Sequence, residues 1–385
     1  MDLAAAGFLG YRYLDRKIPD ELFVEKGSGT DVSRLISHPL VTFPEAVTVS
    51  GDGGYLLPCR ILGMIPFKDV KVMPTDGKTV LVSGSTVGLY METEGVLVVD
   101  TGEILTKNGE TKDPAKNILK PGDYIISMNK ERITSKRELM EDLDALEEER
   151  VILEVVRDGA AIPVSLTPVR DAKGDYKLGI WVRDDTQGIG TLTYVDEQGR
   201  FGALGHGISD VDTGGLLKIR DGALYKARVL GIQKGAKGSP GELSGLIRYE
   251  KKNVIGTIEK NTGNGIYGDY QGLMEGDVSL CPMKVGYKQE METGPASILC
   301  CVENQVQEYQ AEITKIDMNH EDNNKSFVIK VTDENLLSAT GGIVQGMSGS
   351  PVLQKGKIVG AVTHVFVQDA ASGYGIFIEN MLKEG

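Results

Sequence analysis

A serine near the C-terminal end of the 385-residue sequence lies between glycines, in the segment Gly-Met-Ser-Gly-Ser-Pro that spans residues 346–351. A serine nucleophile needs an exposed hydroxyl and backbone N–H groups directed at the oxyanion that develops during acyl transfer. Glycines beside the serine let the backbone turn tightly and approach a substrate without a Cβ clash. These residues predict that Ser348 is a catalytic nucleophile.

Such a serine needs a general base, which is most often a histidine, and the sequence contains four histidines. His206 lies between two glycines, in a position exposed enough to reach a substrate. His364 follows the serine on a predicted strand and is the alternative base. His38 precedes a proline and His320 lies in a polar loop, so they are weaker candidates.

The composition predicts that short strands position these residues. The sequence has 49 glycines but only 14 prolines, with no repeating glycine period and many Val, Ile and Thr residues. This pattern favours a mostly β fold with many tight turns. The length predicts more than one domain. We divide the chain into an N-terminal segment at 1–35, a small β region at 36–77, a second domain at 78–170 and a third at 171–385.

The charge and apolar patterns exclude several function classes. Asp and Glu number 55 against 42 Lys and Arg, a net charge of −13, which argues against a general nucleic-acid binder. No segment has the roughly 18–20 apolar residues that span a bilayer. The apolar residues 1–11 are either the remnant of an anchor or a frayed terminal turn. The four cysteines form no C-x-x-C pair, so no metal is expected, and no cofactor is expected either.

One glycine-rich segment imitates a nucleotide-binding loop. Residues 263–268 match G-x-G-x-x-G after a predicted strand. A dinucleotide site also requires a helix that opens directly after the glycines, and the sequence predicts none there. We interpret this segment as a β connection.

The second domain carries a specific motif. Residues 119–129 read Leu-Lys-Pro-Gly-Asp-Tyr-Ile-Ile-Ser-Met-Asn, a helix capped by Ser135 follows, and two strands then meet at Asp158-Gly159. This order resembles a bacterial PDZ domain. The resemblance implies that a peptide adds as a strand beside residues 87–91 and faces the helix at 136–146. Backbone N–H groups near Val87, Gly88, Leu89 and Tyr90 would then hold a terminal carboxylate. The alternative is an edge strand without a ligand.

The serine loop resembles the nucleophile loop of chymotrypsin-like peptidases, which implies a double β-barrel in residues 171–385. In that family the N–H groups of the first glycine and of the serine form the oxyanion hole, which correspond to Gly346 and Ser348. The histidine precedes the serine in the chain, and this order favours His206 as base. Met347 replaces the acidic residue that commonly precedes the serine, so a zymogen-type pairing with a new N-terminus is not expected.

The whole of residues 36–385 resembles the stage IV sporulation protein B peptidases, in which a PDZ domain precedes the peptidase. The resemblance implies catalytic roles for Ser348, His206 and Asp333, and a functionally sensitive strand at Thr363. Asp333 also begins a predicted short helix at 332–341, where an aspartate is a good N-cap. Both roles stay open for Asp333. The other possible orienters of the histidine are Asp210, Asp212, Asp269 and Asp277.

The family implies a specific biology. Its members are made in the developing spore, cross into the space between the two membranes and usually carry an N-terminal anchor. They cleave their own N-terminal segment and then the regulatory partner of an intramembrane metalloprotease, which triggers processing of a late mother-cell sigma factor. The alternative hypothesis is a non-catalytic PDZ adaptor with a degenerate peptidase-like domain.

Overall fold

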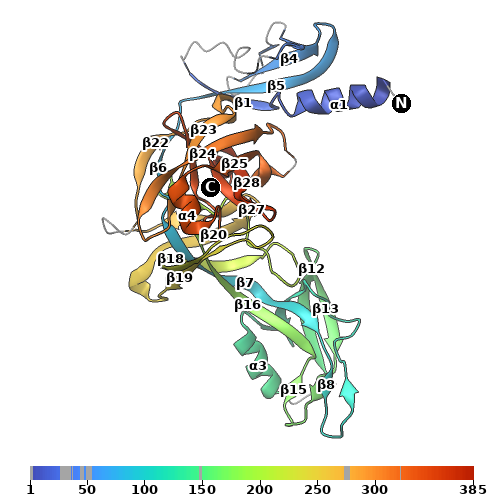
Figure 1. The fold of residues 1–385 in the computed structure, drawn as a ribbon. Coiled ribbons are helices and arrows are strands. Elements are labelled where there is room, and N and C mark those ends of the chain that lie inside the picture. Colours follow the sequence, from blue (N-terminus) through green and yellow to red (C-terminus); the bar gives the residue numbers. More distant parts are fainter. Residues whose placement is uncertain are drawn as a thin grey trace.

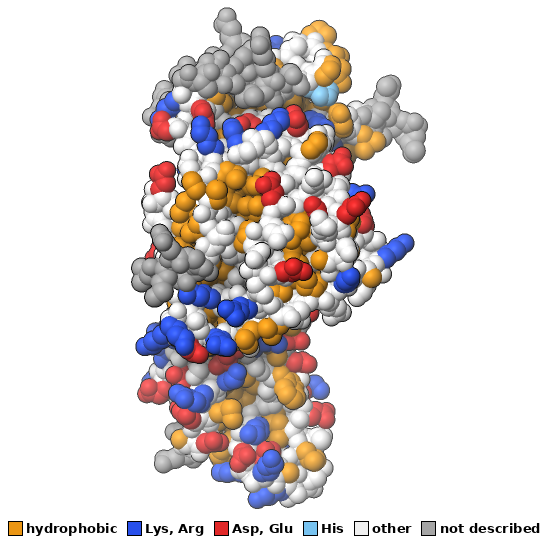
Figure 2. Space-filling view, turned by 60° about the vertical axis from the view of Figure 1, so that its left-hand side comes forward, with side chains coloured by type: hydrophobic (Ala, Val, Ile, Leu, Met, Phe, Trp, Pro, Cys, Tyr) orange, Lys and Arg blue, Asp and Glu red, His pale blue; other side chains and the backbone are white. Residues whose placement is uncertain are grey.

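The computed structural model describes residues 3–26, 36, 38–43, 47–48, 54–146, 150–272, 278–320 and 322–385. Strands form most of it, and three bodies follow one another along its length (Figure 1). An N-terminal sheet lies at one end, two barrels lie in the middle, and a small unit with one helix lies at the other end. Lys and Arg side chains gather where the barrels meet this small unit (Figure 2). The prediction of a mostly β fold is confirmed.

The C-terminal barrel is closed and carries the serine loop. Its strands pair in the order β23-β24-β25-β28-β27-β26. Their bounds are Gly294–Cys301 for β23, Val306–Ile316 for β24, Phe327–Val331 for β25, Pro351–Gln354 for β26, Lys357–Phe366 for β27 and Asp369–Phe377 for β28. Alternate side chains point inward and bury Ile298, Ile313, Ile329 and Val362 in one core. The helix α4, Glu334–Thr340, precedes the serine loop.

The other barrel is a ring in which β7 pairs with β18, β18 with β20, β20 with β21, β21 with β17, β17 with β16, and β16 again with β7. The ring strands are β7 (Thr86–Thr101), β16 (Ile180–Val195), β17 (Arg200–Ala203), β18 (Ile219–Gln233), β20 (Val254–Thr262) and β21 (Gly265–Tyr270). The flanking strands are β6 (Thr79–Val82), β19 (Glu242–Ile247) and β22 (Cys281–Lys284). The segment 263–268 is the β20–β21 connection, as predicted. The two rings together confirm the double β-barrel.

The small unit, which we call the insert unit, spans residues 94–183. It interrupts the ring of β7, β16, β17, β18, β20 and β21, which we call the first ring. It uses the second half of β7 and the first residues of β16, so both strands run from the ring into the unit (Figure 1). Its other elements are β8 (Ile104–Leu105), β9 (Thr111–Lys112), β10 (Tyr124–Met128), β11 (Glu131–Arg132), α3 (Lys136–Asp144), β12 (Val151–Arg157), β13 (Ala160–Leu166), β14 (Val169–Arg170) and β15 (Tyr176–Lys177).

Local signals in the insert unit correspond to the elements that form. Ser135 is the N-cap of α3, because its hydroxyl accepts the N–H of Glu138 at 3.2 Å. Asp158 and Gly159 both have positive φ, which gives the β12–β13 hairpin the turn that matches strand twist. The Lys120 N–H donates to Asp123 at 3.0 Å and closes the loop of the 119–129 motif. The capped helix and the hairpin are confirmed.

The N-terminal region forms one body where the sequence suggested two. It contains α1 (Leu3–Asp15), β1 (Glu21–Glu25), β2 (Val41–Thr42), β3 (Val47–Thr48), β4 (Tyr55–Ile61) and β5 (Ile65–Thr75). β1 pairs in parallel with β5, and Leu14 and Leu22 pack in the same core as Val70. The division at residue 35 therefore cuts through a shared sheet. No helix among the described residues is long and apolar enough to cross a bilayer.

The expected ligand edge at residues 87–90 is wrong. Gly88 pairs with Ile189 of β16 on one side and with Tyr225 of β18 on the other, so no edge is open for a peptide. Val87 and Leu89 are fully buried in the core of the first ring. The predicted domain boundary at residue 78 also differs from the structure. Residues 79–92 belong to the ring and its flanking strand β6, and the insert unit begins after them.

We predict that Leu89→Ala lowers the free energy of unfolding by about 2–5 kcal/mol, because it removes a fully buried side chain from the ring core. Chemical denaturation measures this change. Met140→Ala is the control, since Met140 is 56% exposed and its loss should change stability by no more than about 0.5 kcal/mol. Equal effects of the two substitutions would contradict a core position for Leu89.

Candidate active site between the barrels

The serine loop has a backbone that glycine alone accommodates at two positions. Gly346 and Gly349 have φ of +98° and +93°. A Cβ atom on Gly349 would lie 2.3 Å from the carbonyl oxygen of Thr191 and 2.5 Å from the nitrogen of Leu204. Met347 points the other way and is buried in the C-terminal barrel core. This packing gives Met347 a structural role at the position where related enzymes commonly have an acid.

Thr191 of β16 holds the loop by its carbonyl groups. The Thr191 hydroxyl donates to the carbonyl oxygen of Gly346 at 2.9 Å, and the Thr191 N–H donates to that of Ser348 at 3.0 Å. The N–H groups of Gly346 and Ser348 donate to no acceptor within the described part of the chain. These are the two amides that the sequence predicts for the oxyanion hole. They are left available because the hydrogen bonds from Thr191 to the loop use the carbonyl groups of these two residues.

His206 lies in the loop between β17 and β18, and this loop meets the serine loop. A Cβ on Gly205 would lie 3.0 Å from the Thr363 side chain, and the Leu204 nitrogen is close to Gly349. The imidazole Nδ1 lies 2.9 Å from the carbonyl oxygen of Gly207. A carbonyl only accepts hydrogen bonds, so Nδ1 carries the proton and Nε2 keeps the lone pair that a general base needs. Burial lowers the pKa of His206, and the hydrogen bond to Gly207 opposes this shift.

His364 packs against His206, with ring centroids 4.8 Å apart and the ring planes inclined by 35°. Burial lowers the pKa of His364 to about 4, and the neighbouring His206 and Lys325 lower it further while Asp322 opposes them. The Nδ1 atom of His364 is buried with no hydrogen-bond partner among the described residues. His364 therefore lies directly beside the proposed base.

The serine hydroxyl is bonded to a backbone carbonyl oxygen. Ser348 Oγ donates to the carbonyl oxygen of Thr363 at 2.8 Å. Thr363 is buried on β27, and its hydroxyl donates to the carbonyl oxygen of Asn324 at 2.6 Å. Beyond Ala361 the chain of β27 leaves β26, so residues 363–366 have no strand partner on the serine side. This is the strand that the sequence predicts for substrate, and the structure brings it next to Ser348.

Asp333 lies outside the site. One carboxylate oxygen accepts the N–H groups of Asn335 at 3.0 Å and Leu336 at 3.1 Å, and the other accepts the N–H of Gln310 at 3.3 Å. Asp333 is therefore the N-cap of α4, and the alternative role that the sequence left open is the one observed. Backbone N–H groups occupy both carboxylate oxygens of Asp333, so no contact supports its expected catalytic role.

The other aspartates do not bond to His206 either. Asp210 and Asp212 pair with Arg183, Asp269 pairs with Arg200 at 2.7 Å, and Asp277 lies outside the described residues. The group that orients the imidazole is the Gly207 carbonyl. No residue type announces this role, since every residue has a carbonyl group. The sequence could reveal it only through the glycines on either side of His206.

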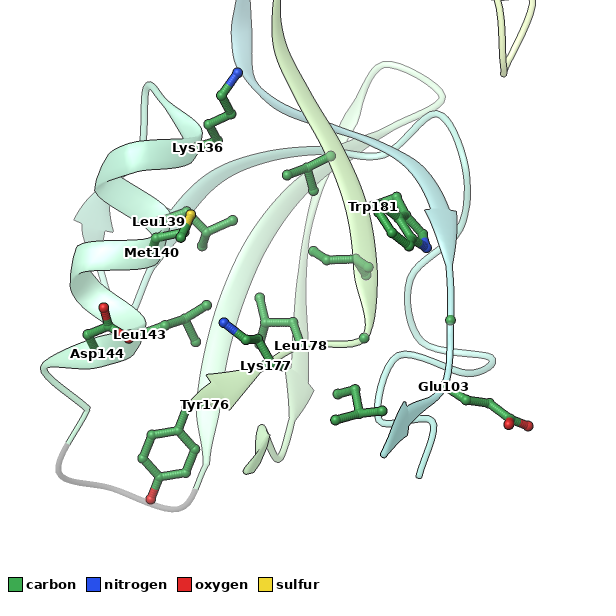
Figure 3. A pocket seen from close by; sticks show the side chains of 15 residues that line it. Glu103, Lys136, Leu139, Met140, Leu143, Asp144, Tyr176, Lys177, Leu178 and Trp181 are labelled. Carbon is green, nitrogen blue, oxygen red and sulfur yellow. The ribbon is translucent and has the colours of Figure 1, made fainter. Parts of the chain in front are cut away.

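A groove lies in the insert unit, beside a different strand from the one expected to bind a peptide. It has a volume of about 310 Å³ between α3 and the first residues of β16 (Figure 3). Leu139 and Leu143 line the helix side, and Leu178, Ile180 and Val182 line the strand side. Residues 180–183 pair with β7 on one edge only, so the edge that faces α3 is open. The Leu178-Gly179-Ile180 sequence, an apolar-Gly-apolar run before a strand, was the signal for this position.

Two β-barrels with a serine, a histidine and free amides at their junction define the class: the protein is a serine peptidase of the chymotrypsin-like type. The profile of the SpoIVB peptidase S55 family matches residues 174–382. The chain belongs to this family. The matched range contains Ser348, His206 and Thr363, and excludes most of the insert unit.

Two proteases are among the solved structures to which the chain is similar. The M. tuberculosis protease Rv3671c in its inactive form aligns with a TM-score of 0.29 and 12% identity, over 51% of this chain and 83% of that one. The HtrA-type protease AlgW with decapeptide aligns with a TM-score of 0.30 and 11% identity, over 52% of this chain and 53% of that one. No curated protein sequence matches the chain.

We predict that Asp333→Ala lowers the free energy of unfolding by about 0.5–2 kcal/mol, and that Asp333→Asn changes it little, because asparagine also caps helices. Both variants should keep the kcat of the parent per folded molecule, since Asp333 caps α4 and contacts no group of the active site. Denaturation curves and peptidase kinetics measure the two effects. A hundredfold loss of kcat in Asp333→Asn at unchanged stability would restore Asp333 as the catalytic acid.

Proposed function

We propose that this serine peptidase is a sporulation-signalling endopeptidase that cleaves its own N-terminal segment and then a regulatory partner of an intramembrane metalloprotease. Cleavage of the partner triggers processing of a late mother-cell sigma factor. The enzyme acts after export across the forespore membrane, in the space between the two membranes. Family membership supports the biological setting. The observation that carries the chemistry is the contact between the loop of His206 and the loop of Ser348, where the N–H groups of Gly346 and Ser348 have no acceptor among the described residues.

The catalytic cycle follows from these positions. The Ser348 hydroxyl rotates from the Thr363 carbonyl towards Nε2 of His206, which takes its proton as the oxygen attacks the peptide carbonyl. The N–H groups of Gly346 and Ser348 stabilise the oxyanion. His206 then returns the proton to the leaving amine, and water hydrolyses the acyl-enzyme by the same route. The Gly207 carbonyl keeps the imidazole in the required tautomer.

We also propose that the groove of the insert unit binds an extended peptide, by addition of a strand to the open edge of residues 180–183. The apolar floor suits an apolar side chain, and Lys177 at the groove suits an acidic ligand or a terminal carboxylate. The C-terminal residues of this chain are held elsewhere. Lys260 Nζ donates to the carbonyl oxygen of Glu384 at 2.7 Å, and Lys383 pairs with Glu21 at 2.6 Å. The ligand in the groove is therefore a different segment or another protein.

We predict that Ser348→Ala abolishes self-cleavage and covalent labelling by a fluorophosphonate, because it removes the hydroxyl of the proposed nucleophile. Intact mass and N-terminal sequencing follow the first effect, and gel fluorescence follows the second. Ser350→Ala is the control, since this serine of the same loop is fully buried and out of reach of substrate. Labelling and trimming that persist in Ser348→Ala, or that stop equally in Ser350→Ala, would contradict the assignment of the nucleophile.

We predict that peptides with an apolar last residue and a free carboxylate change the fluorescence of Trp181. This residue is the only tryptophan in the sequence, lies at the groove and is 68% exposed. Affinity should fall at least tenfold for the C-terminal amide and for Met140→Arg, which places a bulky charge in the groove. Met64→Arg, an exposed change in the N-terminal sheet, is the control. Equal affinity of acid and amide, unchanged in Met140→Arg, would exclude the groove as the peptide site.

A further inference from the structure

Arg183 connects the groove strand to the loop that carries the catalytic base. It is the residue directly after the groove-lining segment 180–182 on β16. Its guanidinium pairs with Asp210 through one nitrogen and with Asp212 at 2.9 Å through the other. The Asp210 carboxylate is fully buried. A buried carboxylate is costly unless it is paired, so this contact constrains both partners strongly.

Asp210 in turn shapes the loop. One of its carboxylate oxygens accepts the N–H groups of Asp212 at 3.1 Å and Thr213 at 2.9 Å, and its carbonyl oxygen accepts the N–H of Gly214 at 2.8 Å. These bonds close a tight turn at residues 210–214, within the segment 206–217. We call these residues the base loop, because His206 is their first member.

The near end of the base loop is clamped by a single side chain. The Asn261 amide accepts the N–H of Ile208 at 2.8 Å and donates to the carbonyl oxygens of Ile208 and Leu217, each at 2.8 Å. Gly207, whose carbonyl orients the imidazole, directly precedes the residues that Asn261 joins. A Cβ on Gly207 would lie 2.4 Å from the Thr262 carbonyl oxygen. A shift of the base loop therefore moves the very group that orients His206.

The base loop also packs against the insert unit. Leu217 is buried with Leu97 and Tyr124 of that unit, and the Lys218 N–H donates to the Tyr124 hydroxyl at 3.1 Å. The loop is thus a layer between the ring and the insert unit. Arg183 makes a charged contact in this layer, with Asp210 and Asp212 of the base loop. It belongs to the strand whose open edge lines the groove.

We propose that Arg183 is a positioning residue for the catalytic base: through Asp210 it holds the base loop, and with it His206, in place relative to the groove strand. A peptide that pairs with residues 180–182 displaces the backbone beside Arg183. The displacement reaches His206 through the side chains of Arg183 and Asp210. This second step rests on the proposed peptide-binding role of the groove. The positioning role itself requires only the contacts between Arg183, Asp210 and the base loop.

The test compares Arg183→Ala with Arg200→Ala. Arg200 also bridges two carboxylates, at 2.8 Å to Glu259 and 2.7 Å to Asp269, and lies on β17, but it does not touch the base loop. We expect Arg183→Ala to lower kcat at least tenfold with KM changed less than twofold. Arg183→Lys, which keeps one charge but loses the two-pronged contact, should recover part of kcat. Arg200→Ala should change kcat less than twofold.

Histidine NMR gives a readout that does not depend on activity. The resonances of ¹³C-labelled histidine, with His206 assigned by His206→Gln, report its titration in each variant. His206 faces His364, and Asp322 and Lys325 lie around His364, so these groups are common to all variants. A loosened base loop admits water, and the midpoint of His206 should rise towards about 6.5 in Arg183→Ala. It should stay at the parent value in Arg200→Ala.

The outcomes separate the hypotheses. An unchanged His206 titration and an unchanged kcat per folded molecule in Arg183→Ala would overturn the positioning role and leave an ordinary structural ion pair. If the parent protein shows no peptidase activity, the proposed function fails, and the titration still decides the role of Arg183. If peptide in the groove alters the kcat of the parent and of Arg183→Ala equally, coupling through Arg183 is excluded.

Discussion

The active site depends on the anchorage of the serine loop by Thr191. Its hydroxyl and N–H bond to the carbonyl oxygens of Gly346 and Ser348, and the N–H groups of these two residues have no acceptor in the part of the chain that the structure describes. An oxyanion hole works because its donors are held in place before charge develops, so little reorganisation is needed during the reaction. Here the rigidity is supplied by a strand of the other barrel. The two barrels must therefore pack correctly before the nucleophile loop acquires its chemistry.

The same strand, β16, connects the three functional features of the molecule. Its first residues line the groove, Arg183 reaches the base loop, and Thr191 holds the serine loop. β16 pairs with β7 from Ile180 to Thr191, with irregularities between Trp181 and Val182 and between Arg183 and Asp185. This arrangement gives the insert unit a structural connection to the catalytic centre, although most of it lies outside the matched family profile.

Ser348, His206 and His364 are each partly exposed, and the resting serine hydroxyl is bonded to a carbonyl oxygen. Desolvation lowers the pKa values of both His206 and His364, which favours the unprotonated form of the base. The serine donates to Thr363, on the strand where substrate would pair. A substrate that competes for this strand would place its own groups where the serine now bonds. Occupancy of the site and rotation of the nucleophile are thus coupled by geometry.

The sequence by itself determined the features that depend on near neighbours. Glycine spacing predicted the serine loop, alternation predicted strands, and Ser135 and Asp158-Gly159 predicted a helix cap and a hairpin. Only the tertiary structure decided which strand edge is open and which group orients His206. The apolar run at residues 87–91 shows that a strand is buried, but hydrophobicity does not say what pairs with its edges. Likewise Asp333 has the right type but caps a helix, and a backbone carbonyl takes the orienting role because the fold places it there.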